Sequence, residues 1–190
     1  MEMKTVYFES GGRHNTEATL KLVKERALAS GIRDVVIASV TGFSAGKALE
    51  ILSGTPIRMT IVNLDGFQGR NFFPTSLKER LREKGHNACS ALDVKYEFPK
   101  EMQTALCRFC EGMKVCVEIM LIATEAGLIQ PGEEIITAGG TGMLGYERGG
   151  GLDTAIVIQA MKSRDFLELE TIYGRKEERR KIREIICKPR

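Results

Sequence analysis

The chain has 190 residues, of which 43% are hydrophobic and 28% charged, a balance typical of a folded globular protein and not of a disordered one. This length suits one sizeable core, so we expect a single domain over residues 1–190. The net charge of +3 is concentrated in residues 175–190, where eight Lys and Arg accompany three Glu, and the other 174 residues sum to −2. A near-neutral body argues against nucleic acid as a partner, and the basic segment is interpreted as a solvated or partner-facing addition.

Three further classes are excluded by the pattern of residues. The most apolar stretch, residues 115–129, contains Glu118 and Glu125 and cannot span a bilayer. The first residues lack the layout of a signal peptide, and five cysteines form no small disulfide framework. Two histidines are too few for most multi-histidine metal sites. We therefore expect a cytoplasmic protein with reduced thiols, no membrane partner and no metal site.

Apolar runs and helical spacings alternate along the chain. In the first half of the chain we predict strands over 5–8, 34–39 and 57–64, separated by a helix over 16–30 that stops at Gly31 and a helix over 45–53. A further helix runs from a capping box at Ser76 and Glu79 to Gly85, and two helices over 99–129 are broken near Gly112. Strands over 134–138 and 153–159 follow, and then a terminal strand through Ile182, Glu184 and Ile186. This alternation predicts an α/β fold, a three-layer αβα sandwich with a mostly parallel sheet.

Four predicted strands end in glycine-rich segments, at 9–15, 41–46, 65–70 and 138–151. In sheets of this class, ligands bind beyond the carboxyl ends of the strands, so the four segments predict a shared binding site. Residues 41–47, Thr-Gly-Phe-Ser-Ala-Gly-Lys, follow a buried strand and open a helix. Their backbone N–H groups would face an anion with the helix dipole behind them. The segment is one residue too short for a Walker A loop, so a phosphate cradle of another type is favoured over a plain capped turn.

The same segment also contains Gly-x-Ser-x-Gly, the nucleophile elbow of α/β-hydrolases. In that interpretation Ser44 is the nucleophile, Asp65 and His86 complete the triad, and Gly11 and Gly12 form the oxyanion loop. Only one strand comes before the strand that leads into the elbow, and His86 follows a helix, so the hydrolase is the weaker hypothesis. A structural or partner-binding domain is a third.

Two further segments have either a functional or an ordinary structural interpretation. Residues 139–151 hold seven glycines, with Thr141, Tyr146 and Arg148 as polar groups, and are typical either of a ligand-binding loop or of a surface loop. Cys107-x-x-Cys110 lies inside a helical pattern, so we expect it to make core contacts with Cys116 and not to act as a thioredoxin-type site.

Two segments are similar to the C-terminal α/β domain of pyruvate kinases. The loop at 41–48, followed by a helix and by Thr55-Pro56-Ile57, resembles that family's T-x-S-G-x-T-A loop, helix and P-x-x-P-I. The segment from Thr137 to Ala155 resembles the family's final glycine-rich hairpin. The resemblance covers about residues 1–160, so residues 160–190 form an extension packing on or beside the domain.

This resemblance implies that the last core strand is antiparallel and that the two loops hold the phosphates of a small molecule. The chain has no Trp and a longer loop than the family, so a nucleotide or flavin mononucleotide suits the site as well as a sugar phosphate. It has no room for the catalytic barrel, so we expect no pyruvate kinase activity. If the domain catalyses a reaction, Asp65 or Glu9 is the expected acid or base. His14 is either a further phosphate contact or a plain surface histidine. The protein could also form a homo-oligomer. The candidate ligand-binding residues are Gly11, Gly12, Asn15, Thr41, Gly42, Phe43, Ser44, Gly46, Lys47, Asp65, Gly66, Phe67, Gly140, Thr141, Gly142 and Arg148.

Overall fold

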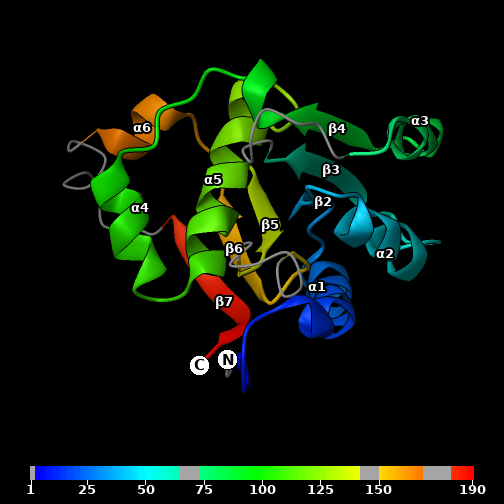
Figure 1. Cartoon of the computed structure of the whole chain (residues 1–190), viewed down its shortest axis with the longest axis horizontal. Coiled ribbons are helices and arrows are strands. Elements are labelled where there is room, and N and C mark those ends of the chain that lie inside the picture. Colours follow the sequence, from blue (N-terminus) through cyan, green and yellow to red (C-terminus); the bar gives the residue numbers. More distant parts are fainter. Residues whose placement is uncertain (1–2, 65–72, 142–149, 169–180) are drawn as a thin grey trace.

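Seven strands form one sheet in the computed structural model of the chain, which describes residues 3–64, 73–141, 150–168 and 181–190 (Figure 1). In order across the sheet, the strands are β1 (Val6–Phe8), β7 (Ile182–Pro189), β6 (Thr154–Gln159), β5 (Glu134–Gly139), β2 (Asp34–Ala38), β3 (Arg58–Asn63) and β4 (Asn87–Ser90). Among these strands, β6 alone runs antiparallel to its neighbours. The prediction of a mostly parallel sheet with an antiparallel last core strand is therefore confirmed.

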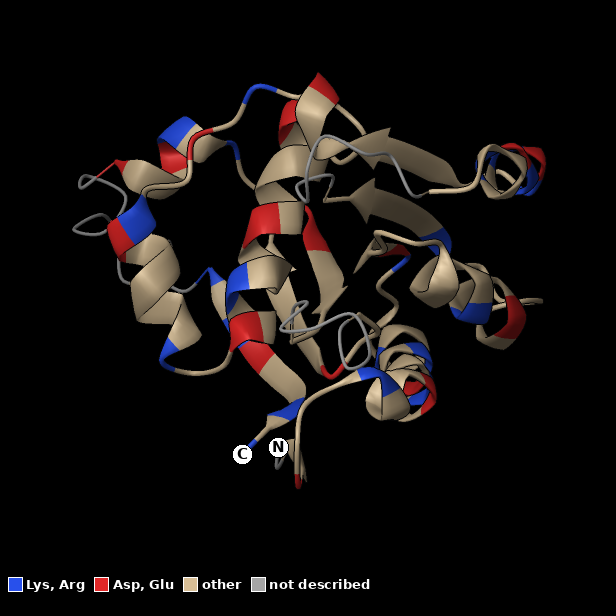
Figure 2. Cartoon of the chain, viewed as in Figure 1, with Lys and Arg blue, Asp and Glu red and all other residues tan. Residues whose placement is uncertain are grey.

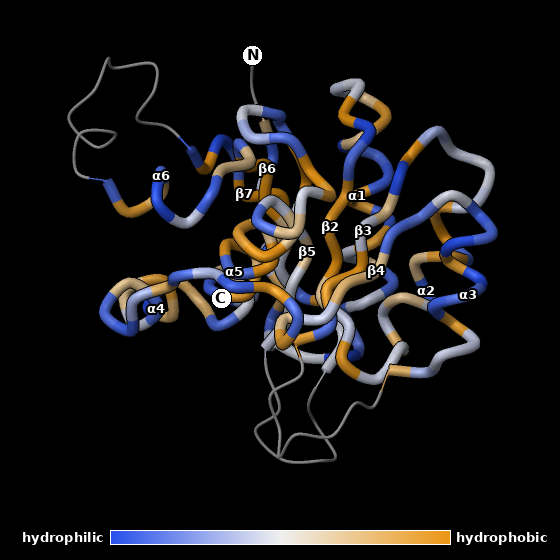
Figure 3. The backbone as a smooth tube through the Cα atoms, turned by 90° about the horizontal axis from the view of Figure 1, so that it is seen from above, coloured by the Kyte–Doolittle hydropathy of each residue, from blue (hydrophilic) through white to orange (hydrophobic). Residues whose placement is uncertain are grey.

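Helices cover both faces of the sheet and complete the three-layer sandwich. One core cluster joins the strands to α1 (Thr16–Ser30), α2 (Phe43–Ile51) and α3 (Thr75–Glu83). A second cluster joins the other face to α5 (Glu111–Glu125), which α4 (Lys100–Cys107) flanks. Figure 3 shows β2, β3, β5 and α5 as largely hydrophobic. Buried runs such as Val35, Val36 and Ile37 in β2 fit a strand that is covered on both faces.

Most of the predicted elements are confirmed, one expectation is wrong and one strand was not predicted. The helix pair in the middle is confirmed with its break at Arg108–Cys110, just before Gly112, which itself lies inside α5. A Cβ at Gly112 would collide with the side chain of Thr154, so this glycine permits close packing of helix on strand. Ser76 does not cap α3, because the helix already begins at Thr75 after Pro74, whose fixed φ suits that position. Strand β4 was not predicted, since its four residues carry no clear apolar alternation.

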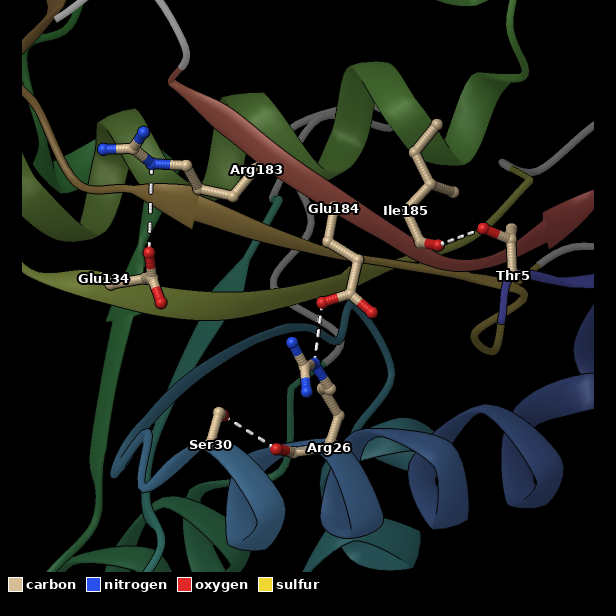
Figure 4. A network of polar contacts seen from close by, with 7 residues as sticks. All are labelled: Thr5, Arg26, Ser30, Glu134, Arg183, Glu184 and Ile185. Atoms are coloured by element: carbon tan, nitrogen blue, oxygen red, sulfur yellow. Dashed lines mark hydrogen bonds and ion pairs between the residues drawn. The ribbon is translucent and has the colours of Figure 1, made fainter. Parts of the chain in front are cut away.

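The C-terminal strand β7 lies inside the sheet, between β1 and β6. Figure 4 shows how it is attached: Glu184 accepts a hydrogen bond from Arg26 of α1 at 2.6 Å, and Thr5 donates one to the Ile185 carbonyl at 2.8 Å. Arg183 lies 3.8 Å from Glu134 of β5. The extension after residue 160 thus supplies a sheet strand, together with the short helix α6 (Ser163–Leu167).

Charges of both signs are interspersed along the helices in Figure 2, as expected for a near-neutral body. No helix in the described ranges is both long and apolar enough to cross a membrane. Residues 169–180, which hold part of the basic segment, lie outside the described residues.

Candidate functional site

The described parts of three glycine-rich segments meet at the carboxyl edge of the sheet, because β1, β2 and β5 run in the same direction across it. We call this the glycine edge and define it as residues 9–15, 39–44, 139–141 and 150–153. The chain passes from β2 toward β3 and β4 on one side and returns to β5 on the other. The glycine edge therefore includes the switch point between β2 and β5, where α/β sheets form a crevice.

Three helices begin at the glycine edge. Helices α1 and α2 directly follow η1 (Arg13–Asn15) and Gly42, and the start of α5 packs against Thr154, which pairs with Gly139 at the end of β5. The first backbone N–H groups of a helix have no partner within the helix, and the macrodipole places partial positive charge there. The edge therefore contains helix N-termini whose N–H groups can donate to an acidic or anionic partner.

The buried carboxylate of Asp153 joins two of the loops. Its Oδ2 accepts hydrogen bonds from the Gly12 N–H at 2.8 Å and the Thr141 N–H at 3.0 Å, while Oδ1 accepts the Thr154 hydroxyl at 2.8 Å. We call these four residues the Asp153 junction. Three donors satisfy the carboxylate without a cation, so it holds the β1–α1 loop against the β5–β6 loop.

Sequence reasoning missed Asp153 as a site residue and placed it only at the start of a strand. The available signal was a carboxylate two residues before the fully apolar run 155–158, because a buried acid must find donors nearby. Its partners, Gly12 and Thr141, were predicted as ligand contacts. The structure brings them together, but their N–H groups face Asp153.

The other glycines of these loops allow backbone and side chains to pack closely. A Cβ at Gly11 would overlap Thr141 Oγ1, and one at Gly140 would overlap the Gly151 carbonyl. Gly151 has a φ of +82° and lies against Arg13 and Thr16. Several of these glycines are therefore needed for packing between the loops. Fewer of them are available to contact a ligand than the number of glycines in the sequence indicates.

The first turn of α2 is arranged differently. Gly42 precedes it with a φ of +86°, and Ser39 Oγ accepts the Ala45 N–H at 3.2 Å. Ser39, not Ser44, therefore makes the recorded side-chain hydrogen bond to this turn, and Ser44 is only 3% exposed. The N–H groups of Phe43 and Ser44 belong to the set that a helix leaves unpaired.

Two cations flank this turn. Lys47 Nζ lies 2.8 Å from Glu17 of α1 and 3.6 Å from Glu50, and its side chain is 33% exposed. The hydrogen bond from Lys47, followed by its charge, lowers the pKa of Glu17, and Glu17 in the same way raises the pKa of Lys47. Arg13 stacks its guanidinium 3.6 Å above the centre of the Phe43 ring. Sequence reasoning identified Lys47 and Phe43 but missed Arg13.

Asn15 shapes the first loop, since it is buried and its Nδ2 donates to the Ser10 carbonyl at 2.7 Å. His14 Nε2 lies 3.4 Å from the Ser10 hydroxyl on the exposed side of the loop. Glu9 is exposed and its carboxylate lies 3.6 Å from Arg190. Of the remaining predicted residues, Asp65, Gly66, Phe67, Gly142, Tyr146 and Arg148 lie outside the described residues.

The hydrolase triad is not assembled in the described residues. His86 Nδ1 accepts the Met59 N–H at 3.3 Å, near the start of β3, and burial lowers the pKa of His86. Ser44 follows the opposite, carboxyl end of the neighbouring strand β2. The two side chains therefore lie at opposite ends of the sheet.

No protein-family model matches the sequence. Within the described ranges, no three His, Cys, Asp or Glu side chains are grouped so that they could hold a metal ion.

Proposed function

We propose that this protein binds a phosphate-bearing small molecule, such as a nucleotide, flavin mononucleotide or a sugar phosphate, at the glycine edge. The observation that carries the proposal is that the N-termini of α1 and α2 adjoin at the switch point between β2 and β5, where Arg13 stacks on Phe43, while α5 begins at the same edge on the other face of the sheet. Oriented backbone N–H groups and helix dipoles at a crevice favour an anionic ligand. The resemblance to the pyruvate kinase C-terminal domain agrees with this function and stays a hypothesis.

Within the edge, the proposal assigns the phosphate to the first turn of α2. The N–H groups of Phe43 and Ser44 would donate to the phosphate oxygens, because the Gly12 and Thr141 N–H groups are already used by Asp153. Lys47 would exchange its exposed partner Glu17 for the phosphate, and Arg13 lies beside the same turn. A buried Ser44 would contribute mainly through its backbone.

The competition between Glu17 and phosphate for Lys47 gives a sharp test. Binding of inorganic phosphate, flavin mononucleotide and a nucleoside monophosphate is measured by calorimetry and by the ligand-induced rise in melting temperature, each variant being compared with its own unliganded form. We expect Lys47→Ala to weaken binding roughly tenfold, the scale of one charge-assisted hydrogen bond. Glu17→Gln should tighten it roughly two- to fivefold, because an exposed competing charge is removed.

The matched control is Lys84→Ala, which removes a cation at the far end of α3 from the glycine edge and should leave affinity unchanged. Equal losses in Lys84→Ala and Lys47→Ala would reduce the effect to bulk charge and overturn the site. Absence of binding by all three ligands would overturn the function. The absorbance spectrum of freshly purified protein shows directly whether a flavin is retained.

A further inference from the structure

Two cysteines lie at the corner between α4 and α5. Cys107 is the last residue of α4 and is exposed, while Cys110 is half-buried at the N-cap of α5. The expectation that both make core contacts is therefore wrong for Cys107, because the helical pattern is broken at this corner. It is confirmed for Cys116, which is buried, and for Cys110, which packs against the second core cluster.

The other three cysteines have a different environment. Cys116 and Cys187 are buried and Cys89 is half-buried, and in each case burial raises the pKa of the thiol, to about 11 for Cys89. A raised pKa keeps these groups as unreactive thiols at neutral pH. Cys107 differs from these three because its side chain is exposed to solvent, and Cys110 follows it at the N-cap of α5.

The two cysteines are three residues apart, joined by a short turn of backbone. Phe109 N–H donates to the Leu106 carbonyl at 3.0 Å and Cys110 N–H reaches the same carbonyl at 3.5 Å, so one more turn continues beyond the end of α4. Cys110 itself has extended backbone, with φ 178° and ψ 160°, and its Sγ lies 3.4 Å from the Thr154 hydroxyl oxygen. A disulfide places the two Cβ atoms about 3.8 Å apart, so its formation requires the Cys110 side chain to leave Thr154 and turn toward Cys107.

A basic groove surrounds the exposed thiol. The groove has a volume of about 400 Å³ and is lined by Lys100, Gln103, Thr104, Cys107, Arg108 and Lys114, with no carboxylate among the described residues of its wall. Lys114 pairs with Glu118 at 2.8 Å, whereas Lys100 and Arg108 form no ion pair within the described part of the chain. These cations would attract an anionic reagent toward the exposed Cys107 sulfur.

We propose that Cys107 and Cys110 form a reversible dithiol–disulfide pair that exchanges with small anionic disulfides docked in this groove. The Cys107 thiolate attacks one sulfur of the disulfide RS–SR, forms the mixed disulfide Cys107–S–SR and releases RS⁻. The Cys110 thiolate then attacks the Cys107 sulfur, forms the Cys107–Cys110 bond and releases the second RS⁻. The protein dithiol loses two electrons and two protons, and RS–SR is reduced to two thiols.

The order of the two steps predicts distinct products for matched variants. The reduced full-length protein is incubated with glutathione disulfide and followed by intact mass and peptide mapping. The unaltered protein should form the Cys107–Cys110 disulfide with only a transient adduct at Cys107. Cys110→Ser should accumulate a persistent adduct at Cys107, and Cys107→Ser should react much more slowly at Cys110. Cys89→Ser is the control and should behave as the unaltered protein does.

The groove is tested through its charge. Lys100→Ala combined with Arg108→Ala should slow the reaction with glutathione disulfide roughly tenfold, an effect of lost electrostatic attraction, while the reaction with the cationic disulfide cystamine should not slow. Equal slowing with both reagents would overturn the role of the groove. Adducts spread evenly over all five cysteines, or a Cys110→Ser variant whose adduct is as transient as that of the unaltered protein, would overturn the pair.

Discussion

The Asp153 junction and the first turn of α2 lie on the same edge of the sheet but use their polar groups in different ways. At the junction, a buried carboxylate occupies the N–H groups of Gly12 and Thr141 and the hydroxyl of Thr154. At α2, a helix start is flanked by Lys47, whose partner Glu17 is half exposed. The N–H groups of the junction are therefore occupied by the protein's own carboxylate, whereas the charged side chains beside α2 are accessible to a ligand. Glycine content alone does not distinguish the two.

The largest effect is expected from removing the centre of the junction. Asp153→Ala leaves two N–H groups and a hydroxyl without their acceptor in a buried setting, and each loss costs about 1–3 kcal/mol. We predict a loss of about 3 kcal/mol or more in the free energy of unfolding, measured by urea denaturation. The exposed Asp93→Ala is the control and should change it by less than about 0.5 kcal/mol. Equal stability of the two variants would show that the junction does not hold the loops.

A smaller loss is expected at Gly112. An alanine there would place Cβ against Thr154 and Asp153, and overpacking of this kind costs about 1–3 kcal/mol. Gly112→Ala should therefore be destabilised in the same denaturation assay. Combining it with Thr154→Gly, which removes both the Cβ and the Oγ1 atoms that the added methyl would meet, should recover part of the loss beyond the sum of the single changes. Strict additivity would contradict close packing of α5 on β6.

Gly46 tests the other side of the comparison. It lies inside α2 with open space where a Cβ would be placed, so no packing contact requires glycine there. Gly46→Ala should raise the free energy of unfolding by about 0.5–1 kcal/mol, the difference in helix propensity. A clear destabilisation would mean that this glycine has a structural role like that of Gly112.

The smallest effect concerns the exposed pair of Glu17 and Lys47. The pKa of Glu17 is lowered by the pair, so its contribution to stability is present above the unfolded-state pKa and is lost as pH falls through the folded value. The pKa of Lys47 is raised, so its contribution is lost as pH rises through the folded value. The stability difference between the unaltered protein and Glu17→Gln should therefore vanish at both extremes of pH. A difference that is constant across pH would contradict the ion pair.

Much of the fold was predictable because helices and strands depend on patterns of neighbouring residues in the sequence. The apolar run Val35–Ile37 predicted a strand that is covered on both faces, as the structure shows. Gly31 predicted the end of a helix, and its φ of +72° is a conformation that glycine adopts readily. Strand β4 was missed because its four residues lie at the sheet edge, where burial on both faces is not required.

The candidate site was predictable as a region but not in its connections. Sequence placed Gly11, Gly12 and Thr141 at strand exits, and those exits do meet. The hydrogen bond from Gly12 to Asp153 joins residues 141 positions apart, a contact that no local periodicity encodes. For the same reason the sequence identified Lys47 without its partner Glu17, and Phe43 without the stacked Arg13.

The central claim is that an anion binds at the first turn of α2 and not at the Asp153 junction. Backbone amide shifts measured by NMR during titration with inorganic phosphate and then with flavin mononucleotide test it most directly. We predict that the amide chemical shifts of Gly42, Phe43 and Ser44 change most and that these changes saturate. The shifts of Gly12 and Thr141 should stay nearly unchanged, and their amides should remain protected from hydrogen exchange. Shifts centred on Gly12 and Thr141, or none at α2 with either ligand, would contradict it.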